Sequence, residues 1–394
     1  MAAAAQPTAA PFDVEALRER EFPLVARAPY LNAAAVAPLP ERARRVVDDY
    51  NLRRAGLHDL TGDDFEPVLA AAREAAARLI GADADEIALL SNTSFGINLA
   101  AHALPLVPGK RVVVSDREFP ANVYPWMQRA DASGAELTLV PTDRWGRPDE
   151  ERILAELASG DVGIFALSAV QFASGYRADL ERFGRACRDN GVYFVVDAIQ
   201  ALGQVPVDVR AAGIDVLACG GHKWLCSPFG TGFAYVRREL VTALEPRVVG
   251  WTAMAGTLDY SKLCDYRYEF WETARRFEVG TMAFHDVAGM TQSIGLLQEI
   301  GPDNIHRHQM DLLDPLVEWL GESGGGEIVS DLRPAHRSGI LCFRPADAEG
   351  AYAELTRAGV ACVLREGAVR ISPHLYNTHD EIATVIEVLS RSGR

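Results

Sequence analysis

The stretch Ile214-Asp-Val-Leu-Ala-Cys-Gly-Gly-His-Lys-Trp-Leu225 decides how the rest of the sequence is interpreted. Its apolar first half predicts a buried strand, and its two glycines allow the backbone to turn tightly and approach a ligand closely. His222 and Lys223 follow this turn directly. Because ligands of covered parallel sheets bind beyond the carboxyl ends of the strands, the stretch predicts that Lys223 lies at a ligand site.

Lysine is rare in this chain, which makes each lysine informative. The 39 Lys and Arg residues include only three lysines, Lys110, Lys223 and Lys262, so arginine is the usual choice for a positive charge. A lysine at the end of a predicted buried strand therefore indicates a role that arginine cannot fill. A primary amine forms a Schiff base with a carbonyl group, whereas a guanidinium does not. The competing interpretation is a lysine in an ordinary surface loop.

Two further stretches carry polar groups at predicted strand ends. In Val192-Tyr-Phe-Val-Val-Asp197-Ala-Ile-Gln200, a carboxylate ends a buried strand. Such a carboxylate can stabilise the protonated nitrogen of a bound pyridine ring, and Gln200 is placed to reach a phenolic oxygen on that ring. The competing interpretation is that Asp197 caps the next helix. In Ser91-Asn-Thr93-Ser94-Phe-Gly96-Ile-Asn98, hydroxyls and helix N-terminal amides suit a phosphate, although such residues also serve as ordinary N-caps.

The motifs together resemble those of the class V aminotransferases. They are Asp197-Ala-Ile-Gln200, Gly221-His222-Lys223 and Arg276-Phe-Glu-Val-Gly280-Thr281, and the resemblance extends over nearly the whole chain. That family includes cysteine desulfurases, kynureninases, isopenicillin N epimerase and several C–S lyases. The resemblance implies pyridoxal 5′-phosphate (PLP) as the cofactor, bound to Lys223 as a Schiff base.

Apolar runs alternate with amphipathic stretches up to about residue 285, which predicts an α/β fold whose mainly parallel sheet is covered on both faces. The resemblance specifies the PLP-dependent transferase fold type I, with a seven-stranded sheet in a large domain and a small C-terminal α+β domain. We expect an N-terminal segment, residues 1–29, that packs on the small domain. The large PLP-binding domain is expected at 30–286 and the small domain at 287–394.

The resemblance implies roles for further residues around the cofactor. Thr93, Ser94 and His222 would bind its phosphate. Phe119 would stack on its ring, and Gln171 would lie beside it. Lys223 would act as the base that removes the Cα proton once the substrate has replaced it on the cofactor.

Other residues are assigned by the resemblance to the substrate and to a second subunit. Arg370 would bind the α-carboxylate of an L-α-amino acid, a role that suits the planar guanidinium fork, and His58 would line the substrate side. Thr281 would reach the partner's phosphate across the interface of a homodimer, which would place the active site at that interface. The aromatic residues of 251–271 could shape a roomy pocket, but ordinary core and interface packing explains them equally well.

Two departures from the desulfurase pattern bear on the reaction. Gly220 replaces the phosphate-binding serine of desulfurases, and the loop that carries their nucleophilic cysteine is shortened before Arg370. Cys362 lies in an apolar run and is expected to be a buried core thiol. We therefore expect a lyase that cleaves the C–S bond of a cysteine-derived conjugate by β-elimination, in secondary metabolism such as antibiotic biosynthesis, and not a persulfide-forming desulfurase. The alternatives are an aminotransferase, an epimerase, a decarboxylating oxidative deaminase, or a sensor without enzymatic activity.

Composition excludes several other classes of protein. The net charge of −15 argues against a nucleic-acid partner, and no apolar run is long enough to span a bilayer. The Ala-rich N-terminus has no basic segment before an apolar core, so we do not expect a secretion signal. The six cysteines are scattered without a metal-binding pattern, which favours a reduced, cytoplasmic protein with no metal site.

Overall fold

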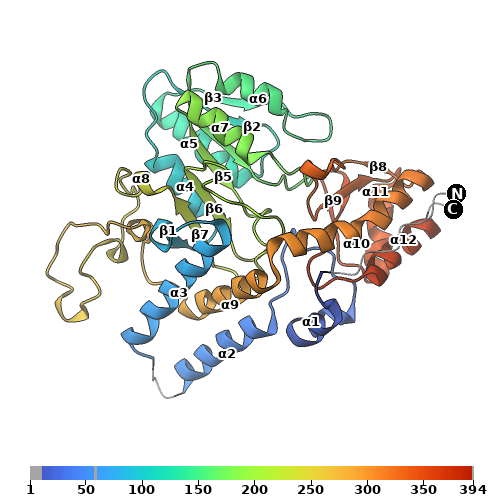
Figure 1. The fold of residues 1–394 in the computed structure, drawn as a ribbon, viewed down its shortest axis with the longest axis horizontal. Helices are drawn as coiled ribbons and strands as arrows, with labels where there is room; N and C mark the ends of the chain where they lie inside the picture. Colours follow the sequence, from blue (N-terminus) through green and yellow to red (C-terminus); the bar gives the residue numbers. More distant parts are fainter. Residues whose placement is uncertain (1–10, 57–59, 393–394) are drawn as a thin grey trace.

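The computed structural model describes residues 11–56 and 60–392, which are built around two β-sheets (Figure 1). The larger sheet has seven strands in the order β1-β7-β6-β5-β4-β2-β3. The neighbours of β7 run antiparallel to it, and all other adjacent strands of this sheet are parallel. The strands are β1 (Ile87–Leu90), β2 (Arg111–Ser115), β3 (Leu137–Val140), β4 (Val162–Ser168), β5 (Tyr193–Asp197), β6 (Val216–Gly220) and β7 (Gly232–Val236). The predicted α/β class and mainly parallel seven-stranded sheet are confirmed.

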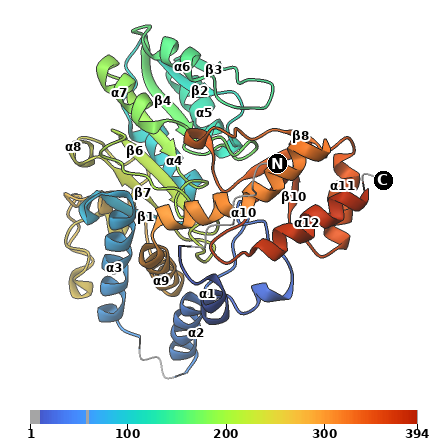
Figure 2. The same ribbon diagram turned by 45° about the vertical axis from the view of Figure 1, so that its right-hand side comes forward.

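The second sheet has four antiparallel strands in the order β10-β11-β9-β8. These strands are β8 (Glu327–Ile328), β9 (Leu341–Arg344), β10 (Val363–Arg365) and β11 (Ala368–Ile371). Figures 1 and 2 show this sheet to one side of the large one, with α10 running from the end of α9 along the smaller sheet. The helices are α1 (Val14–Glu21), α2 (Glu41–Ala55), α3 (Gly62–Ile80), α4 (Thr93–Ala103), α5 (Tyr124–Ser133), α6 (Glu150–Leu157), α7 (Leu180–Asn190), α8 (Arg238–Val241), α9 (Phe284–Ile300), α10 (Pro302–Ser323), α11 (Ala348–Arg357) and α12 (His379–Ser392).

Helices cover both faces of the large sheet, because its central strands are apolar on both sides. On β5, Phe194 and Val196 belong to the core beneath α3, α7 and α9, whereas Val195 belongs to the core beneath α4 and α5. The rings of Phe165 and Phe194 stack across adjacent strands with centroids 5.5 Å apart. Alternation of this kind is the expected consequence of a parallel sheet buried on both faces.

The N-terminal segment contacts the C-terminal part of the chain. Arg18 on α1 donates to the carbonyl oxygen of Tyr376 at 2.8 Å and pairs with Glu381 at 3.2 Å. Helix α9 packs against α2 and α3, beside the large sheet. The predicted boundary between residues 286 and 287 falls near the start of this helix, and the division into 1–29, 30–286 and 287–394 stays a prediction.

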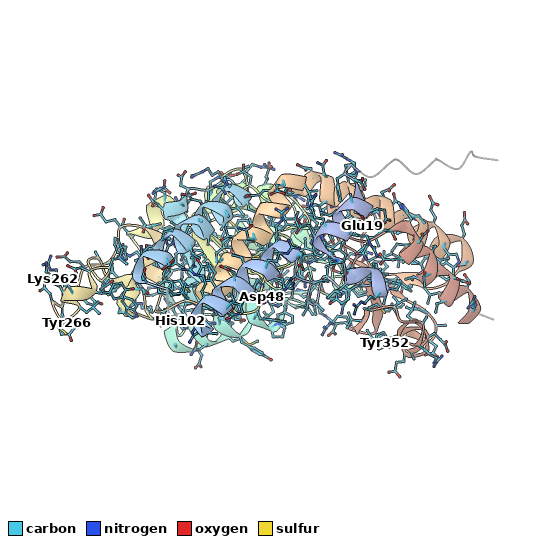
Figure 3. All side chains as sticks on the ribbon, turned by 90° about the horizontal axis from the view of Figure 1, so that it is seen from below. Glu19, Asp48, His102, Lys262, Tyr266 and Tyr352 are labelled. Carbon is cyan, nitrogen blue, oxygen red and sulfur yellow. The ribbon has the colours of Figure 1, made fainter. Side chains whose placement is uncertain are left out.

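The segment from Val249 to Trp271 projects from the body of the molecule as an arm, seen as the gold loop in Figure 1. Figure 3 shows Lys262 and Tyr266 at its outer end. A cavity of about 860 Å³ is lined by arm residues, and none of the residues named around Lys223 borders it. This cavity therefore belongs to the arm, and a role for the aromatic residues of 251–271 in a substrate pocket stays a prediction.

Candidate active site

Five loops that leave the large sheet converge at one edge. Strands β2, β4, β5 and β6 are parallel, and β1 shares their direction because it pairs antiparallel with β7. Their carboxyl ends therefore meet at the same edge. The residues delivered there, in strand order of the chain, are Thr93, Phe119, Gln171, Asp197 and Lys223.

Lys223 is an amine without an ion-pair partner among the described residues. Its Nζ lies 5.5 Å from the centroid of the Phe119 ring. Burial lowers the pKa of Lys223 to about 8, and attraction to Asp197 only partly opposes that shift. A lowered pKa increases the share of neutral amine near neutral pH, which is the form that reacts with a carbonyl.

Asp197 is a carboxylate in an apolar setting. It is 2% exposed, and its Oδ1 accepts a hydrogen bond from the Ile199 amide at 3.0 Å. The pKa of Asp197 is raised to about 7, because burial, together with nearby Glu118, outweighs the opposing effects of the Ile199 amide and Lys223. A cationic ring nitrogen beside Asp197 would offset this cost of burial, so the residue fits the predicted pyridinium partner.

Glu118 is a functional candidate that sequence reasoning did not single out. This buried carboxylate accepts hydrogen bonds from the Ser168 amide at 2.8 Å, from the Asn122 side chain at 3.0 Å and from Gln171 Nε2 at 2.6 Å, as well as from the Ser168 hydroxyl. Burial raises its pKa, and these donors oppose the rise. The glutamate lies three residues after the end of β2 and precedes Phe119, and this position just beyond a strand end was the available signal.

The N-terminus of α4 lies against the strand that carries Lys223. Asn92 caps the helix by accepting from the Phe95 amide at 2.9 Å, and the buried Thr93 hydroxyl accepts from the Gly220 amide at 2.9 Å. A Cβ at position 220 would lie 3.1 Å from Thr93 Oγ1, so glycine relieves a close approach there. Ser94 is exposed at the same helix end, where amides and hydroxyls suit an anion.

The other predicted cofactor ligands differ in whether their polar atoms already have partners in the protein. His222 stacks on Phe229 with centroids 5.2 Å apart, and burial together with Lys223 lowers its pKa. Gln200 donates to the Ala34 carbonyl at 3.0 Å and accepts from Trp224 Nε1 at 2.7 Å. Both ends of its amide are therefore engaged, and its contact with a phenolic oxygen stays a prediction. Gln171 Oε1, by contrast, is buried without a partner among the described residues.

Arg370 on β11 is a buried guanidinium that lacks an acidic partner. It is 2% exposed, and its Nη1 donates to the Phe172 carbonyl at 2.9 Å. Its Nε and Nη2 are buried without a hydrogen-bond acceptor among the described residues. Burial lowers the pKa of Arg370 to about 10. A substrate carboxylate would satisfy both unpaired nitrogens in a bidentate contact.

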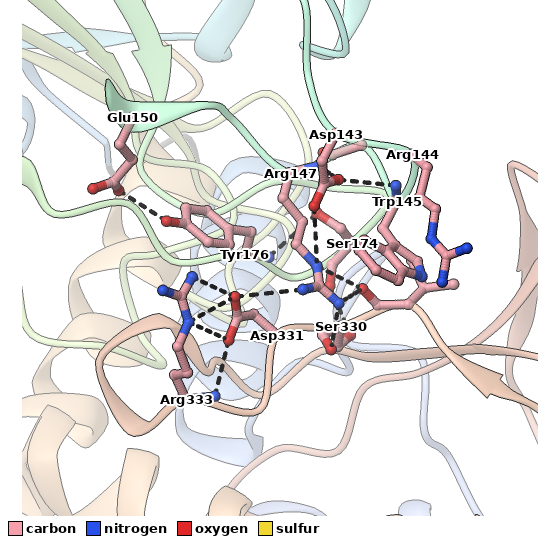
Figure 4. A network of polar contacts seen from close by, with 12 residues as sticks. Asp143, Arg144, Trp145, Arg147, Glu150, Ser174, Tyr176, Ser330, Asp331 and Arg333 are labelled. Atoms are coloured by element: carbon pink, nitrogen blue, oxygen red, sulfur yellow. Dashed lines mark hydrogen bonds and ion pairs between the residues drawn. The ribbon is translucent and has the colours of Figure 1, made fainter. Parts of the chain in front are cut away.

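The segment 171–176, whose Phe172 carbonyl accepts from Arg370, takes part in a network of polar contacts, part of which Figure 4 shows. Ser330 Oγ donates to the Ser174 carbonyl at 2.6 Å, and Tyr176 donates to Glu150 at 3.0 Å. Asp331 pairs with Arg147 at 3.5 Å. These contacts fix the loop that carries Gln171 and Phe172 between the two sheets.

The remaining predicted residues lie elsewhere or outside the described part. Thr281 is exposed, and His58 falls outside the described residues. Cys362 is 7% exposed and burial raises the pKa of its thiol to about 11, in agreement with a core position. Within residues 11–56 and 60–392, no group of three or more His, Cys, Asp or Glu side chains is arranged to hold a metal ion. No helix in the same ranges is long and apolar enough to cross a membrane.

These residues fit PLP because several of their polar groups lack the partners that PLP and an amino-acid substrate would supply. An unpaired amine, a buried carboxylate with a raised pKa, an aromatic ring and a helix N-terminus surround one strand edge. The buried oxygen of Gln171 and the unpaired nitrogens of Arg370 add polar atoms that still lack partners. A phosphorylated pyridine aldehyde and an amino-acid carboxylate supply the complementary groups.

Comparisons with known proteins agree with this geometry. The chain matches the family model "Aminotransferase class-V" over residues 29–385. It is 32% identical to a probable cysteine desulfurase of Methanothermobacter thermautotrophicus, over 94% of this chain and 96% of that protein. The apo structure of a cysteine desulfurase from Thermococcus onnurineus NA1 superimposes with a TM-score of 0.86 at 25% identity, covering 100% of this chain and 99% of the other.

A second solved structure shows the same fold at lower identity. It is a cystine C–S lyase in complex with its product cysteine persulfide, with a TM-score of 0.85 at 20% identity, covering 94% of this chain and 99% of the other. The desulfurase names of the relatives run against the expectation that this chain is not a desulfurase. The family model spans most of the chain, and the chain therefore belongs to the class V aminotransferase family of PLP-dependent enzymes.

Proposed function

We propose that this enzyme is a lyase that cleaves the C–S bond of a cysteine-derived conjugate by β-elimination. One observation carries the proposal. Among the described residues, a base and an arginine that can bind a carboxylate are present, but no accessible thiol lies beside them. Lys223 has a lowered pKa, Arg370 has unpaired donors, and Cys362 is buried with a raised pKa. Elimination needs a base and a leaving group on the substrate, whereas transfer of sulfur from cysteine to the enzyme as a persulfide needs an enzyme thiolate.

Each residue has a defined part in this proposal. PLP supplies an electron sink that stabilises negative charge at Cα. Arg370 holds the α-carboxylate and thereby orients the Cα–H bond, and the Lys223 amine takes the Cα proton. Asp197 keeps its carboxylate beside the ring nitrogen, and Phe119 covers the ring. Thr93, Ser94 and His222 bind the phosphate at the N-terminus of α4.

The proposal extends to the assembly and its setting. We propose a homodimer in which Thr281 reaches the phosphate site of the other subunit, and the exposure of Thr281 in its own chain supports this. A cytoplasmic location and a role in secondary metabolism such as antibiotic biosynthesis complete the proposal. His58 would border the substrate.

Persulfide formation from cysteine is the second candidate, and the names of the sequence relatives favour it. Cys264 is the exposed cysteine among the described residues, and it lies on the projecting arm. A desulfurase would therefore need a thiol that does not lie in the loop before Arg370. Transamination, epimerisation and decarboxylating deamination use the same Lys223 and Arg370, and they differ in the fate of the carbanion.

Product analysis separates these reactions. The purified enzyme is incubated with L-cysteine and with S-alkyl-L-cysteines. Release of pyruvate, ammonia and a free thiol supports elimination, and a variant that lacks Cys264 should retain full activity. Formation of alanine with a persulfide on the enzyme would establish the desulfurase reaction instead. Accumulation of pyridoxamine phosphate would indicate transamination.

A further inference from the structure

A second arginine lies on the same face of the β10–β11 hairpin as Arg370. In the antiparallel register Arg365 stands opposite Ala368, and Val363 stands opposite Arg370. Residues opposite each other in a ladder project to the same face, and so do residues two apart on one strand. The side chains of Arg365 and Arg370 are therefore diagonal neighbours on one face.

That face looks toward the large sheet. Ala368 belongs to the core of the large sheet, whereas Leu364 and Val369, on the opposite face, pack into the core of the smaller sheet. Arg370 reaches across to the carbonyl oxygen of Phe172. Arg365 is thus directed toward the same side of the hairpin, facing the large sheet, as the residue that we assign to the α-carboxylate.

The turn of the hairpin holds Arg365 in this position. Glu366 and Gly367 both have positive φ values, 49° and 73°, as expected for a two-residue turn of type I′. Such a turn fixes the register of the two strands, so Arg365 cannot slip to the other face without breaking the ladder. Glu366 is exposed and lies 3.8 Å from Arg117, not against Arg365.

Arg365 is a cation without a counter-ion. Its Nε is buried without a hydrogen-bond acceptor among the described residues, and no ion pair of Arg365 is formed there. Its charge lowers the pKa of both Lys223 and Arg370, so the three cations lie close enough to repel one another. Arg365 is partly exposed, and its buried Nε lacks an acceptor, so a ligand anion would supply a partner for this nitrogen and for the charge.

One carboxylate does not satisfy both arginines. The free Nε and Nη2 of Arg370 form the edge that takes both oxygens of an α-carboxylate. A substrate with only that anion would leave Arg365 unpaired. Resting on the proposed function, we propose that Arg365 binds a second carboxylate in the S-substituent of the substrate, so that the enzyme prefers S-substituted cysteines with an anionic substituent.

Two nearly isosteric probes test this specificity. S-carboxymethyl-L-cysteine carries the second carboxylate, and S-carbamoylmethyl-L-cysteine replaces it by a neutral amide. Binding to the holoenzyme is measured by the change in the visible spectrum of the cofactor, and pyruvate release is measured separately. The wild type should bind the carboxylate probe roughly ten- to hundredfold more tightly, as expected for a charge-assisted hydrogen bond.

Variants assign the preference to one side chain. Arg365→Gln should remove it and leave the affinity for the neutral probe within about twofold, whereas Arg365→Lys should retain part of it. The matched control is Arg357→Gln, because Arg357 is 68% exposed on α11 and pairs with Glu354. This control should behave as the wild type does. Equal cofactor content in all four proteins excludes a folding defect.

The outcomes separate the inference from the proposed function. No preference in the wild type would overturn the role of Arg365, and so would an Arg365→Gln variant that weakens both probes equally, since both arginines would then share one carboxylate. If neither probe nor L-cysteine changes the spectrum, the proposed function fails, and the inference fails with it.

Discussion

Lys223 is an amine held in a largely apolar setting at the end of β6. Since burial lowers its pKa from the ordinary 10.5 to about 8, protonation is lost as the pH rises through about 8. The neutral amine is the reactive form, so the rate at which cofactor-free protein takes up PLP should rise with pH and level off above about 8. Stopped-flow absorbance measures this rate. A rate that rises only near the ordinary lysine pKa would show that burial does not govern the amine.

Glu118 is the residue that orders the loop beside the cofactor. A Glu118→Gln substitution keeps the shape of the side chain. It can, however, place an NH₂ group at the position of the carboxylate oxygen that accepts from Gln171 Nε2 and from the Ser168 amide. We expect a loss of about 1–3 kcal/mol in the free energy of unfolding, because a buried donor then lacks an acceptor. Urea denaturation of the holoenzyme measures this loss. The exposed Glu366→Gln change is the control, and equal stability of the two variants would contradict the ordering role.

At the scale of elements, the contacts between the two sheets position the loop beneath Arg370. Ser330 Oγ donates to the Ser174 carbonyl and accepts from the Cys342 amide at 2.8 Å. A Ser330→Ala change should raise the KM for the substrate by roughly fivefold, the equivalent of one hydrogen bond, with little effect on cofactor affinity. Ser390→Ala on α12 is a matched control, since its hydroxyl bonds only within its helix. An equal effect of both changes would refute a positioning role for Ser330.

The strands of the large sheet were predictable because they are short, largely apolar runs, and four of them, β2, β4, β5 and β6, end in a polar residue or a glycine. Helix α4 begins at Thr93 because the Asn92 side chain caps it. Helix α10 continues through Pro315, where local propensity would end a helix, because tertiary packing keeps it helical. Local signals fix such boundaries poorly when capping or packing decides them.

The candidate site likewise contains residues that the local sequence identifies and contacts that it does not. Lys223 and Asp197 could be found because they lie at or just beyond the end of a buried strand in a recognisable motif, and Arg370 because its motif resembles that of the family. The hydrogen bonds of Gln200 with Trp224 and with the Ala34 carbonyl could not be predicted, because those partners come from distant parts of the chain. The orientation of Arg365 likewise depends on a strand register that no local pattern specifies.

At the scale of the whole molecule, the proposed dimer predicts that two defective subunits complement each other. Thr281→Ala and Lys223→Ala proteins should each be impaired alone. A mixed dimer contains one intact site if Thr281 serves the partner's phosphate, so partial activity should return on mixing. Subunit exchange is verified by mass spectrometry. Absence of recovery after proven exchange would rule out the shared site.

The central claim is that Lys223 carries PLP. The most direct measurement is borohydride reduction of the purified holoenzyme, followed by peptide mass spectrometry. The account predicts that the reduced cofactor is found on the peptide containing Lys223, that Lys110 and Lys262 remain unmodified, and that Lys223→Ala abolishes the labelling. Labelling of another residue, or a protein that binds no cofactor under conditions where it is folded, would contradict the account.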